Sequence, residues 1–363
     1  MWQYQLLETD RLPEWLIRWG IRNMLKETLE KHQRTTLEEQ QLDKINFINE
    51  LKQLPIAIET DAANEQHYEV PSEFYKYTLG PRRKYSSALW YQYTKTLSEA
   101  ENNMLALYCK RANIQNGQRI LDLGCGWGSM ALYLAENFPQ AHITALSNSN
   151  SQREYIESVA KENGWHHLNV VTANISNYDT DWTFDRIVSI EMLEHMKNYE
   201  KLFEKISRWL EPEGLFFTHI FTHERFAYHY EDTDGTDWLT RHFFTGGTMP
   251  SADLFHYFQK NLTLENQWSV DGTHYEKTAN AWLENMHQHK EEIFPILEAT
   301  YGKEQTTRWW VRWKVFMMAC AELWGYKNGQ EWAVTHYLFS PKSAHKKPPL
   351  NHSGLTLETG HMS

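Results

Sequence analysis

Short apolar segments alternate with amphipathic helical segments from Arg119 to Phe221, and this alternation restricts the fold more than any other feature of the chain. The apolar segments are RILDLG, HITALS, LNVVTA, FDRIVSI and GLFFTHIF. Between them, residues 129–138, 151–163 and 199–210 have apolar side chains at helical spacing. Strands that alternate with helices form a parallel sheet whose crossover helices cover both faces. We therefore expect an α/β fold.

The chain before this region has helical patterns. Apolar residues recur at helical spacing among Glu, Lys and Gln from Leu12 to Leu54, which predicts two helices. Further helices are expected at 72–77 and 98–112. The sequence therefore predicts an N-terminal helical cap.

The chain after this region changes character. Residues 223–250 are polar, aromatic and glycine-containing, which suggests an excursion or lid. Helices are expected at 276–300 and 304–326, and the run EWAVTHYLF predicts a closing strand. The final GHMS resembles vector-derived residues. The expected organisation is a helical cap, a cofactor-binding core, a substrate region of lid, helices and closing strands, and a partly disordered or vector-derived tail, over residues 1–115, 116–222, 223–342 and 343–363.

Composition and charge exclude several classes of partner. The formal net charge is −11, so the chain offers no basic surface for nucleic acid and would be repelled by an anionic membrane. No stretch approaches the roughly 20 apolar residues of a membrane span, and the first residues lack a signal-peptide run. Cys109, Cys125 and Cys320 have neither disulfide nor zinc spacing. We expect a cytoplasmic protein with a small-molecule partner.

A glycine-rich turn follows the first expected strand. In LDLGCGWGS, Gly124, Gly126 and Gly128 let the backbone bend sharply and approach a ligand closely. Such a turn can be purely structural, or it can face a dinucleotide or a nucleoside sulfonium. A dinucleotide fingerprint would need glycine where Ser129 stands. The G-x-G-x-G spacing, with Asp122 just before it, instead resembles the first motif of S-adenosylmethionine-dependent methyltransferases.

Two carboxylates and an imidazole follow the fourth expected strand. In IVSIEMLEHMKNY the apolar run ends at Ile190, and Glu191, Glu194 and His195 come next. If the run is a buried strand, these side chains lie beyond its carboxyl end, where open α/β sheets bind ligands. At spacing i, i+3, i+4 they would also share one face of a helix, which is usually a solvated stripe. The spacing alone leaves both interpretations open.

The residues after the second strand indicate one branch of these methyltransferases. That strand usually ends in an acidic residue that binds the ribose, whereas here it ends with Ser147, Asn148 and, one turn later, Gln152. This pattern resembles the branch that contains cyclopropane fatty acid synthases, mycolic acid methyltransferases and plant alkaloid N-methyltransferases. Upstream, Tyr85-Ser86 in KYSSALW resembles the element with which that branch closes over the cofactor.

Longer segments resemble the coclaurine, pavine and tetrahydroprotoberberine N-methyltransferases of benzylisoquinoline alkaloid biosynthesis. These segments are EMLEHMKNYEKLFEKISRWL, FFTGGTMPSADLFHYFQ and AELWGYKNGQEW, and the resemblance runs from about Leu12 to Lys342. It implies a class I, Rossmann-like methyltransferase fold: a seven-stranded, mostly parallel sheet with an N-terminal helical cap and C-terminal helical and lid insertions. It also implies S-adenosyl-L-methionine as cofactor, and the relatives suggest a homodimer.

The same resemblance assigns site residues. Cofactor contacts are expected from Tyr85, Ser86, Asp122, Gly124, Gly126, Gly128, Ser147, Asn148, Gln152, Asn174, Ile175 and Ile190. Phe244, Trp324 and Tyr326 are expected to wall an apolar substrate pocket, although each of them taken singly fits a core position as well.

The expected reaction is methyl transfer to the nitrogen of a small amine, such as a tetrahydroisoquinoline or benzylisoquinoline alkaloid. An alkylamine is protonated at neutral pH, since its reference pKa is roughly 10.4, and its lone pair must be freed before it attacks the methyl group. His195 is the best candidate base, and Glu194 or Glu191 would stabilise the resulting imidazolium. The resemblance adds Glu69, in YEVP, to the residues that bind and deprotonate the substrate.

Two other functions compete with this one. A lipid-directed methyl or methylene transferase of the same fold would need a bicarbonate site that includes a Cys after the Tyr-Ser element, where this chain has Ser87. A cofactor-binding scaffold without catalysis is disfavoured by the Glu194-His195 pair. Methyl transfer from a sulfonium needs no metal, and we expect none. No standard metal site fits the spacing of the four histidines His219, His223, His229 and His242.

Overall fold

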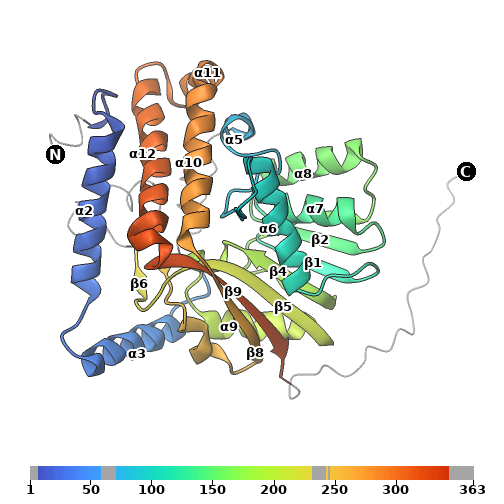
Figure 1. Cartoon of the computed structure of the whole chain (residues 1–363). Helices are drawn as coiled ribbons and strands as arrows, with labels where there is room; N and C mark the ends of the chain where they lie inside the picture. Colours follow the sequence, from blue (N-terminus) through green and yellow to red (C-terminus); the bar gives the residue numbers. More distant parts are fainter. Residues whose placement is uncertain (1–6, 59–70, 231–242, 244–245, 343–363) are drawn as a thin grey trace, which may run out of the picture.

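A seven-stranded sheet forms the centre of the computed structural model, which describes residues 7–58, 71–230, 243 and 246–342 (Figure 1). Its strands are β1 (Arg119–Leu123), β2 (His142–Ser147), β3 (Leu168–Thr172), β4 (Phe184–Ile190), β5 (Leu210–His223), β8 (Leu262–Val270) and β9 (Trp332–Pro341). The strand order is β3-β2-β1-β4-β5-β9-β8. β1 to β5 pair in parallel, and β9 runs antiparallel between β5 and β8. The expected α/β fold with a mostly parallel sheet is confirmed.

Helices cover both faces of this sheet. The helices that follow strands β1, β2 and β4 are α7 (Ser129–Asn137), α8 (Asn150–Glu162) and α9 (Tyr199–Trp209). One hydrophobic cluster joins α7 and α8 to α6 (Leu97–Arg111), and a second cluster lies around α9. The strands between these clusters are buried on both sides, which explains why β1 and β4 read as nearly continuous apolar runs.

A helical layer beside the sheet consists of α2 (Glu14–His32), α10 (Gly272–Gln288), α11 (Lys290–Tyr301) and α12 (Thr306–Gly325) (Figure 1). The short helix α5 (Ser72–Thr78) contacts α10 and α11, and α3 (Leu37–Gln53) contacts α9. α2 packs on α12 through the buried residues Ile17 and Ile21. Arg18 of α2 also donates hydrogen bonds to Glu322 at 2.9 Å and Asn280 at 2.8 Å. The N-terminal helices are therefore joined to the C-terminal ones.

The structure differs from the sequence prediction in two places. The single helix expected at 276–300 is two helices, because the chain leaves helical geometry at His289, whose φ and ψ are −108° and 30°. Strand β8 has no counterpart among the predicted segments. Its middle residues, from Glu265 to Gln267, are exposed, since β8 lies at the edge of the sheet. Asn266, at a shift in register, interrupts the alternation of its apolar residues.

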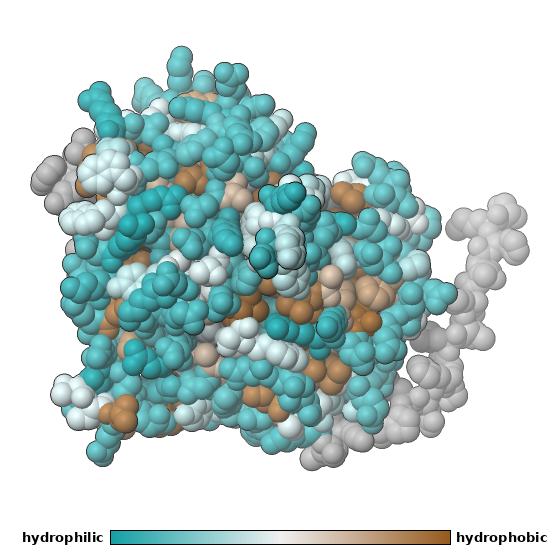
Figure 2. All heavy atoms as spheres, viewed as in Figure 1, coloured by the Kyte–Doolittle hydropathy of each residue, from teal (hydrophilic) through white to brown (hydrophobic). Residues whose placement is uncertain are grey.

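The face of the molecule in Figure 2 is mostly hydrophilic, and its apolar atoms gather near the middle. Within the described residues, no helix has the length and apolar character needed to cross a bilayer. The expected tail over 343–363 lies outside the described residues.

Candidate functional site

A cavity lies at the carboxyl ends of β1 and β4, where open α/β sheets bind their ligands. Its empty volume is about 1210 Å³, including its opening to solvent. The glycine-rich turn lines one side, and the residues after β4 line another. The segment 83–86 and side chains from α10 and α12 complete the wall. The cavity is therefore shared by the sheet and the helical layer.

The glycine-rich turn depends on backbone conformations that favour glycine. Gly124, Gly126 and Gly128 have φ values of 82°, 51° and 81°. A Cβ atom on Gly124 would lie 2.8 Å or less from the side chain of Met192, and one on Gly128 would lie 2.6 Å from Ile156. Gly124 and Gly126 line the cavity, and Gly126 has open space where a side chain would stand. The turn thus leaves room for a ligand to lie against the backbone.

A polar pair after β2 offers a donor to the same cavity. The Ser147 hydroxyl donates to Gln152 Oε1 at 2.6 Å, which fixes the orientation of that amide. Gln152 Nε2 is buried and has no hydrogen-bond partner among the described residues, and Gln152 lines the cavity. A buried donor of this kind requires an acceptor. A ribose hydroxyl would supply one, so the residues present fit a nucleoside.

Asp122 ends the first strand beside this donor. Its Oδ2 atom is buried without a hydrogen-bond partner among the described residues, and burial raises the pKa of Asp122 to about 7. Asp122 also lines the cavity. Together, Asp122 and Gln152 are unsatisfied polar groups that face the glycine turn, which is the arrangement expected of a cofactor site.

The segment Lys84–Ser87 closes the cavity from the side of the helical layer. Lys84 is fully buried, and its ammonium donates to the Ser86 hydroxyl and, at 2.8 Å, to the Ser87 carbonyl. Burial lowers the pKa of Lys84 to about 8. The ring of Tyr85 lies 5.7 Å from that of Trp282. The buried lysine therefore fixes the backbone that carries Tyr85 and Ser86 into the cavity.

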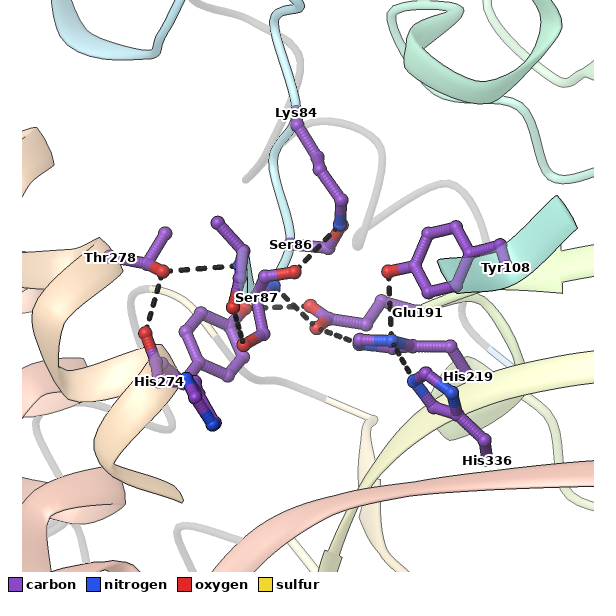
Figure 3. A network of polar contacts seen from close by, with 11 residues as sticks. Lys84, Ser86, Ser87, Tyr108, Glu191, His219, His274, Thr278 and His336 are labelled. Atoms are coloured by element: carbon purple, nitrogen blue, oxygen red, sulfur yellow. Dashed lines mark hydrogen bonds and ion pairs between the residues drawn. The ribbon is translucent and has the colours of Figure 1, made fainter. Parts of the chain in front are cut away.

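Glu191 is the most constrained side chain of the site (Figure 3). Its φ is 45°, a left-handed conformation that is uncommon for a non-glycine residue. Oε1 accepts from Ser87 N at 3.0 Å and from His219 Nε2 at 2.9 Å, and Oε2 accepts from Tyr275 Oη at 2.7 Å. Burial raises the pKa of Glu191 to about 7, while the Lys84 charge and the donors Tyr275 and Ser87 act in the opposite direction. The Glu191 side chain is only 7% exposed and still lines the cavity.

Glu194 and His195 also line the cavity. They lie in a single 3-10 turn, Leu193–His195, so the alternative of a solvated α-helical stripe is wrong. Glu194 is buried, and its Oε2 atom has no hydrogen-bond partner among the described residues. Burial and the neighbouring Glu191 charge hold the pKa of Glu194 well above its usual range. Two carboxyl groups and an imidazole therefore meet at the end of β4.

Most of the predicted site residues lie together in the cavity wall. Those that line it are Tyr85, Ser86, Asp122, Gly124, Gly126, Gln152, Ile190, Glu191, Glu194, His195 and Trp324. The wall does not include Gly128, Ser147, Asn148, Asn174, Ile175 or Tyr326. Ser147 holds Gln152, and Gly128 N donates to the Cys125 carbonyl at 2.8 Å; both Gln152 and Cys125 line the cavity. Tyr326 packs its ring 5.4 Å from that of Trp332. Glu69 and Phe244 lie outside the described residues.

Sequence reasoning missed several residues that surround Glu191. Lys84, Tyr108 and Tyr275 line the cavity, and His219 donates to the Glu191 carboxylate. The sequence offered two indications of these residues: Lys84 adjoins the Tyr-Ser element, and His219 lies within an apolar strand. A polar residue in such a strand needs a buried partner, and that partner is Glu191. Among the described residues, no group of three His, Cys, Asp or Glu side chains is placed to hold a metal ion.

Comparisons with known proteins agree with this geometry. The family described as mycolic acid cyclopropane synthetase matches residues 57–332. (S)-coclaurine N-methyltransferase from Papaver somniferum is 39% identical over 93% of this chain and 97% of its own length. Pavine N-methyltransferase from Thalictrum flavum subsp. glaucum is 34% identical over 89% of this chain and 92% of its own length. A crystal structure of coclaurine N-methyltransferase bound to N-methylheliamine and SAH matches with a TM-score of 0.91 at 38% identity, covering 93% of this chain and 98% of that one.

Proposed function

The chain belongs to the mycolic acid cyclopropane synthetase family and, within it, to the S-adenosylmethionine-dependent N-methyltransferases, and on this premise we propose that it methylates a tetrahydroisoquinoline-like secondary or tertiary amine. The amine class is that of relatives named for coclaurine and pavine. When bound, S-adenosylmethionine supplies an electrophilic methyl group on a cationic sulfur.

The observation that carries this proposal is the buried Glu191 carboxylate beside the glycine turn. Three protein donors reach it, which leaves one of its roughly four acceptor positions free. A protonated amine is both a cation and a hydrogen-bond donor, so it matches that position. An alkene carries no charge before it reacts, so a buried anion would not contribute to its binding.

The amine must lose a proton before it reacts, and we assign that proton to His195. The His195 imidazole lines the cavity with the two carboxyl groups. In its neutral form it takes a proton from the ammonium, and the freed lone pair forms the new N–C bond as the C–S bond of the donor breaks. Glu191 and Glu194 lie beside the imidazolium that results, and one proton leaves the site in each turnover.

Aromatic side chains on the other walls suit a flat, apolar amine. Trp324 stacks on Tyr275 with ring centroids 4.8 Å apart and planes 1° from parallel, and Phe221 lies 5.4 Å from Trp324. Trp282 and Phe316 line the same cavity. These rings can pack on an aromatic substrate and also attract a cation through their faces.

Transfer of a labelled methyl group tests the proposal. The purified chain would be given methyl-labelled S-adenosylmethionine with coclaurine-like amines, simple arylalkylamines or vesicles of unsaturated phospholipid. We expect label on the isoquinoline amine with the highest kcat/KM. Label found only in lipid would overturn the amine assignment, and a preference for arylalkylamines would overturn the isoquinoline class.

A further inference from the structure

A chain of three side chains leads away from Glu191 through the sheet. His219 of β5 contacts Glu191 through Nε2, and its Nδ1 lies 2.9 Å from Nε2 of His336 on β9. Nδ1 of His336 lies 2.6 Å from Nη1 of Arg111, the last residue of α6. Figure 3 shows the two imidazoles in line with the Glu191 carboxylate, with Tyr108 beside them. Both histidines are fully buried.

The identity of the last group fixes the direction of the hydrogen bonds that join Arg111, His336, His219 and Glu191. The Tyr108 hydroxyl lies 2.8 Å from the same His219 Nδ1 atom and competes with His336 Nε2 for it. A guanidinium can only donate, so His336 Nδ1 accepts from Arg111. A neutral His336 then carries its proton on Nε2 and donates to His219 Nδ1. His219 therefore carries its own proton on Nε2 and donates to Glu191. The acceptor for His219 is Glu191 Oε1, and an ionised carboxylate accepts this hydrogen bond more strongly than a neutral carboxyl group does.

We propose that Arg111 and His336 are positioning residues which act through His219 to hold Glu191 in its ionised form, so that Glu191 binds the substrate cation while His195 takes its proton. The assignment of that cation rests on the proposed amine methylation, whereas the direction of the hydrogen bonds from Arg111 to Glu191 does not.

Two observations support this division of roles. Burial, followed by the charges of Lys84 and Arg111, lowers the pKa of His219 well below its usual range, and burial likewise lowers that of His336. Both imidazoles are thus neutral, as the direction of the bonds requires. In addition, Arg111 cannot accept a proton, so the chain ends in a group that blocks proton transfer outward. A proton taken up by Glu191 could not leave along it.

The pH response of Glu191 depends on all groups that face it. The cationic and donor groups favour the ionised carboxylate, and the neighbouring Glu194 opposes it. Titratable groups surround Glu191 from every neighbouring element: the loop after α5, α6, the end of β4, β5, α10 and α12. In that order they are Lys84, Tyr108, Glu194 with His195, His219, Tyr275 and Cys320. In the series Glu191, His219, His336 and Arg111, Arg111 is the charged group farthest from the cavity. Its guanidinium also lies 4.9 Å from the centre of the Trp268 ring.

Histidine tautomers measured by NMR test the chain directly. In full-length protein labelled with 15N at histidine, we expect His219 and His336 each to show a protonated Nε2 and an unprotonated Nδ1, with assignments from His219→Gln and His336→Gln. A proton on Nδ1 of either histidine, or a doubly protonated His219 near pH 7, would overturn the proposal. This readout needs no substrate, so it stands apart from any failure of amine methylation.

Variants of Arg111 test the consequence for turnover. Arg111→Gln removes the charge and the donor-only end, so the acidic limb of the pH profile of kcat/KM should move upward by about half a pH unit, which is about a threefold loss at pH 6. Arg111→Lys keeps a donor-only cation and should restore most of the profile. The matched control is Lys110→Gln, an exposed residue of the same helix. The proposal is contradicted if folded Arg111→Gln leaves the acidic limb of the kcat/KM profile at the same pH, or if Lys110→Gln shifts that limb by the same amount.

Discussion

The two halves of the cavity are built in different ways. The half proposed to hold the cofactor is lined largely by one stretch of chain, Asp122 to Gln152, and much of that stretch is backbone held by glycine conformations. The half proposed to bind the amine centres on Glu191, whose carboxylate accepts hydrogen bonds from Ser87, His219 and Tyr275 on three other elements. A local motif can recur in any protein that uses the same cofactor, whereas an anion held by donors from three separate elements can be altered piece by piece. This difference explains why one fold can keep a methyl donor while its acceptor changes.

The largest expected effect is on the amine side, where His195→Ala removes the proposed base. We expect kcat/KM to fall about 10²- to 10⁴-fold, because general base catalysis contributes effects of this size. Calorimetry should show cofactor affinity close to wild type. His166→Ala, an exposed histidine, is the control. If His195→Ala weakens cofactor binding by a similar factor, His195 contributes to the cofactor half of the cavity as well as to the amine half.

Glu191→Gln should have the next largest effect. The amide keeps the shape and the acceptor for His219 but removes the charge, so kcat/KM for an ammonium substrate should fall about 100-fold, the size of a buried charge-assisted interaction. Glu194→Gln is the matched comparison, and its loss should be less than about tenfold, because burial and the Glu191 charge favour the protonated form of Glu194. If steady-state kinetics show a larger loss of kcat/KM for Glu194→Gln than for Glu191→Gln, Glu194 and not Glu191 would be the residue that binds the substrate cation.

On the cofactor side, Gln152→Leu should weaken S-adenosylmethionine binding about tenfold, as expected for one lost hydrogen bond. Because the amine half is untouched, kcat at saturating cofactor should stay within about twofold. Isothermal titration and kinetics separate the two quantities. The exposed Glu154→Gln in the same helix should change neither. A fall in kcat without a change in affinity would show that Gln152 serves the amine half instead.

The smallest effect concerns Glu101, which supports the loop shared by both halves. Its carboxylate accepts from Arg82 N at 3.0 Å, and burial raises the pKa of Glu101 from its usual 4.5 to about 7. Between these values the native state binds more protons than the unfolded state, so this residue makes stability fall as pH rises from 4.5 to 7. In urea unfolding, Glu101→Gln should reduce that fall by roughly 1 kcal/mol. An unchanged slope, as expected for exposed Glu154→Gln, would contradict the role of Glu101.

The cofactor half could be predicted from sequence because its parts are close in the chain. The glycine spacing and the Ser147 and Gln152 pair predicted it, the α/β class followed from the alternation of strands and helices, and the family followed from longer segments. Strand β8 was missed because Asn266, at a shift in register, interrupts its alternating apolar residues. The prediction also had no means of seeing that β9 enters the sheet beside β5.

The surroundings of Glu191 could not be predicted in the same way. The three residues after β4 were identified from their position, but Tyr275 is 84 positions from Glu191, and His336 is 117 positions from His219. No periodicity links such residues, and only the folded sheet brings them into contact. The sequence analysis considered His219 only as a metal ligand and found no suitable spacing, whereas the structure places it against the Glu191 carboxylate.

The place of β9 in the sheet has a consequence for synthesis of the protein. Among the described residues β9 is the last strand, yet it lies between β5 and β8 and carries His336. Until β9 has left the ribosome, β5 has an unpaired edge and β8 has no partner in the sheet, and unpaired edges promote association with other chains. The hydrogen bond from His336 to His219 therefore forms only after β9 has been synthesised.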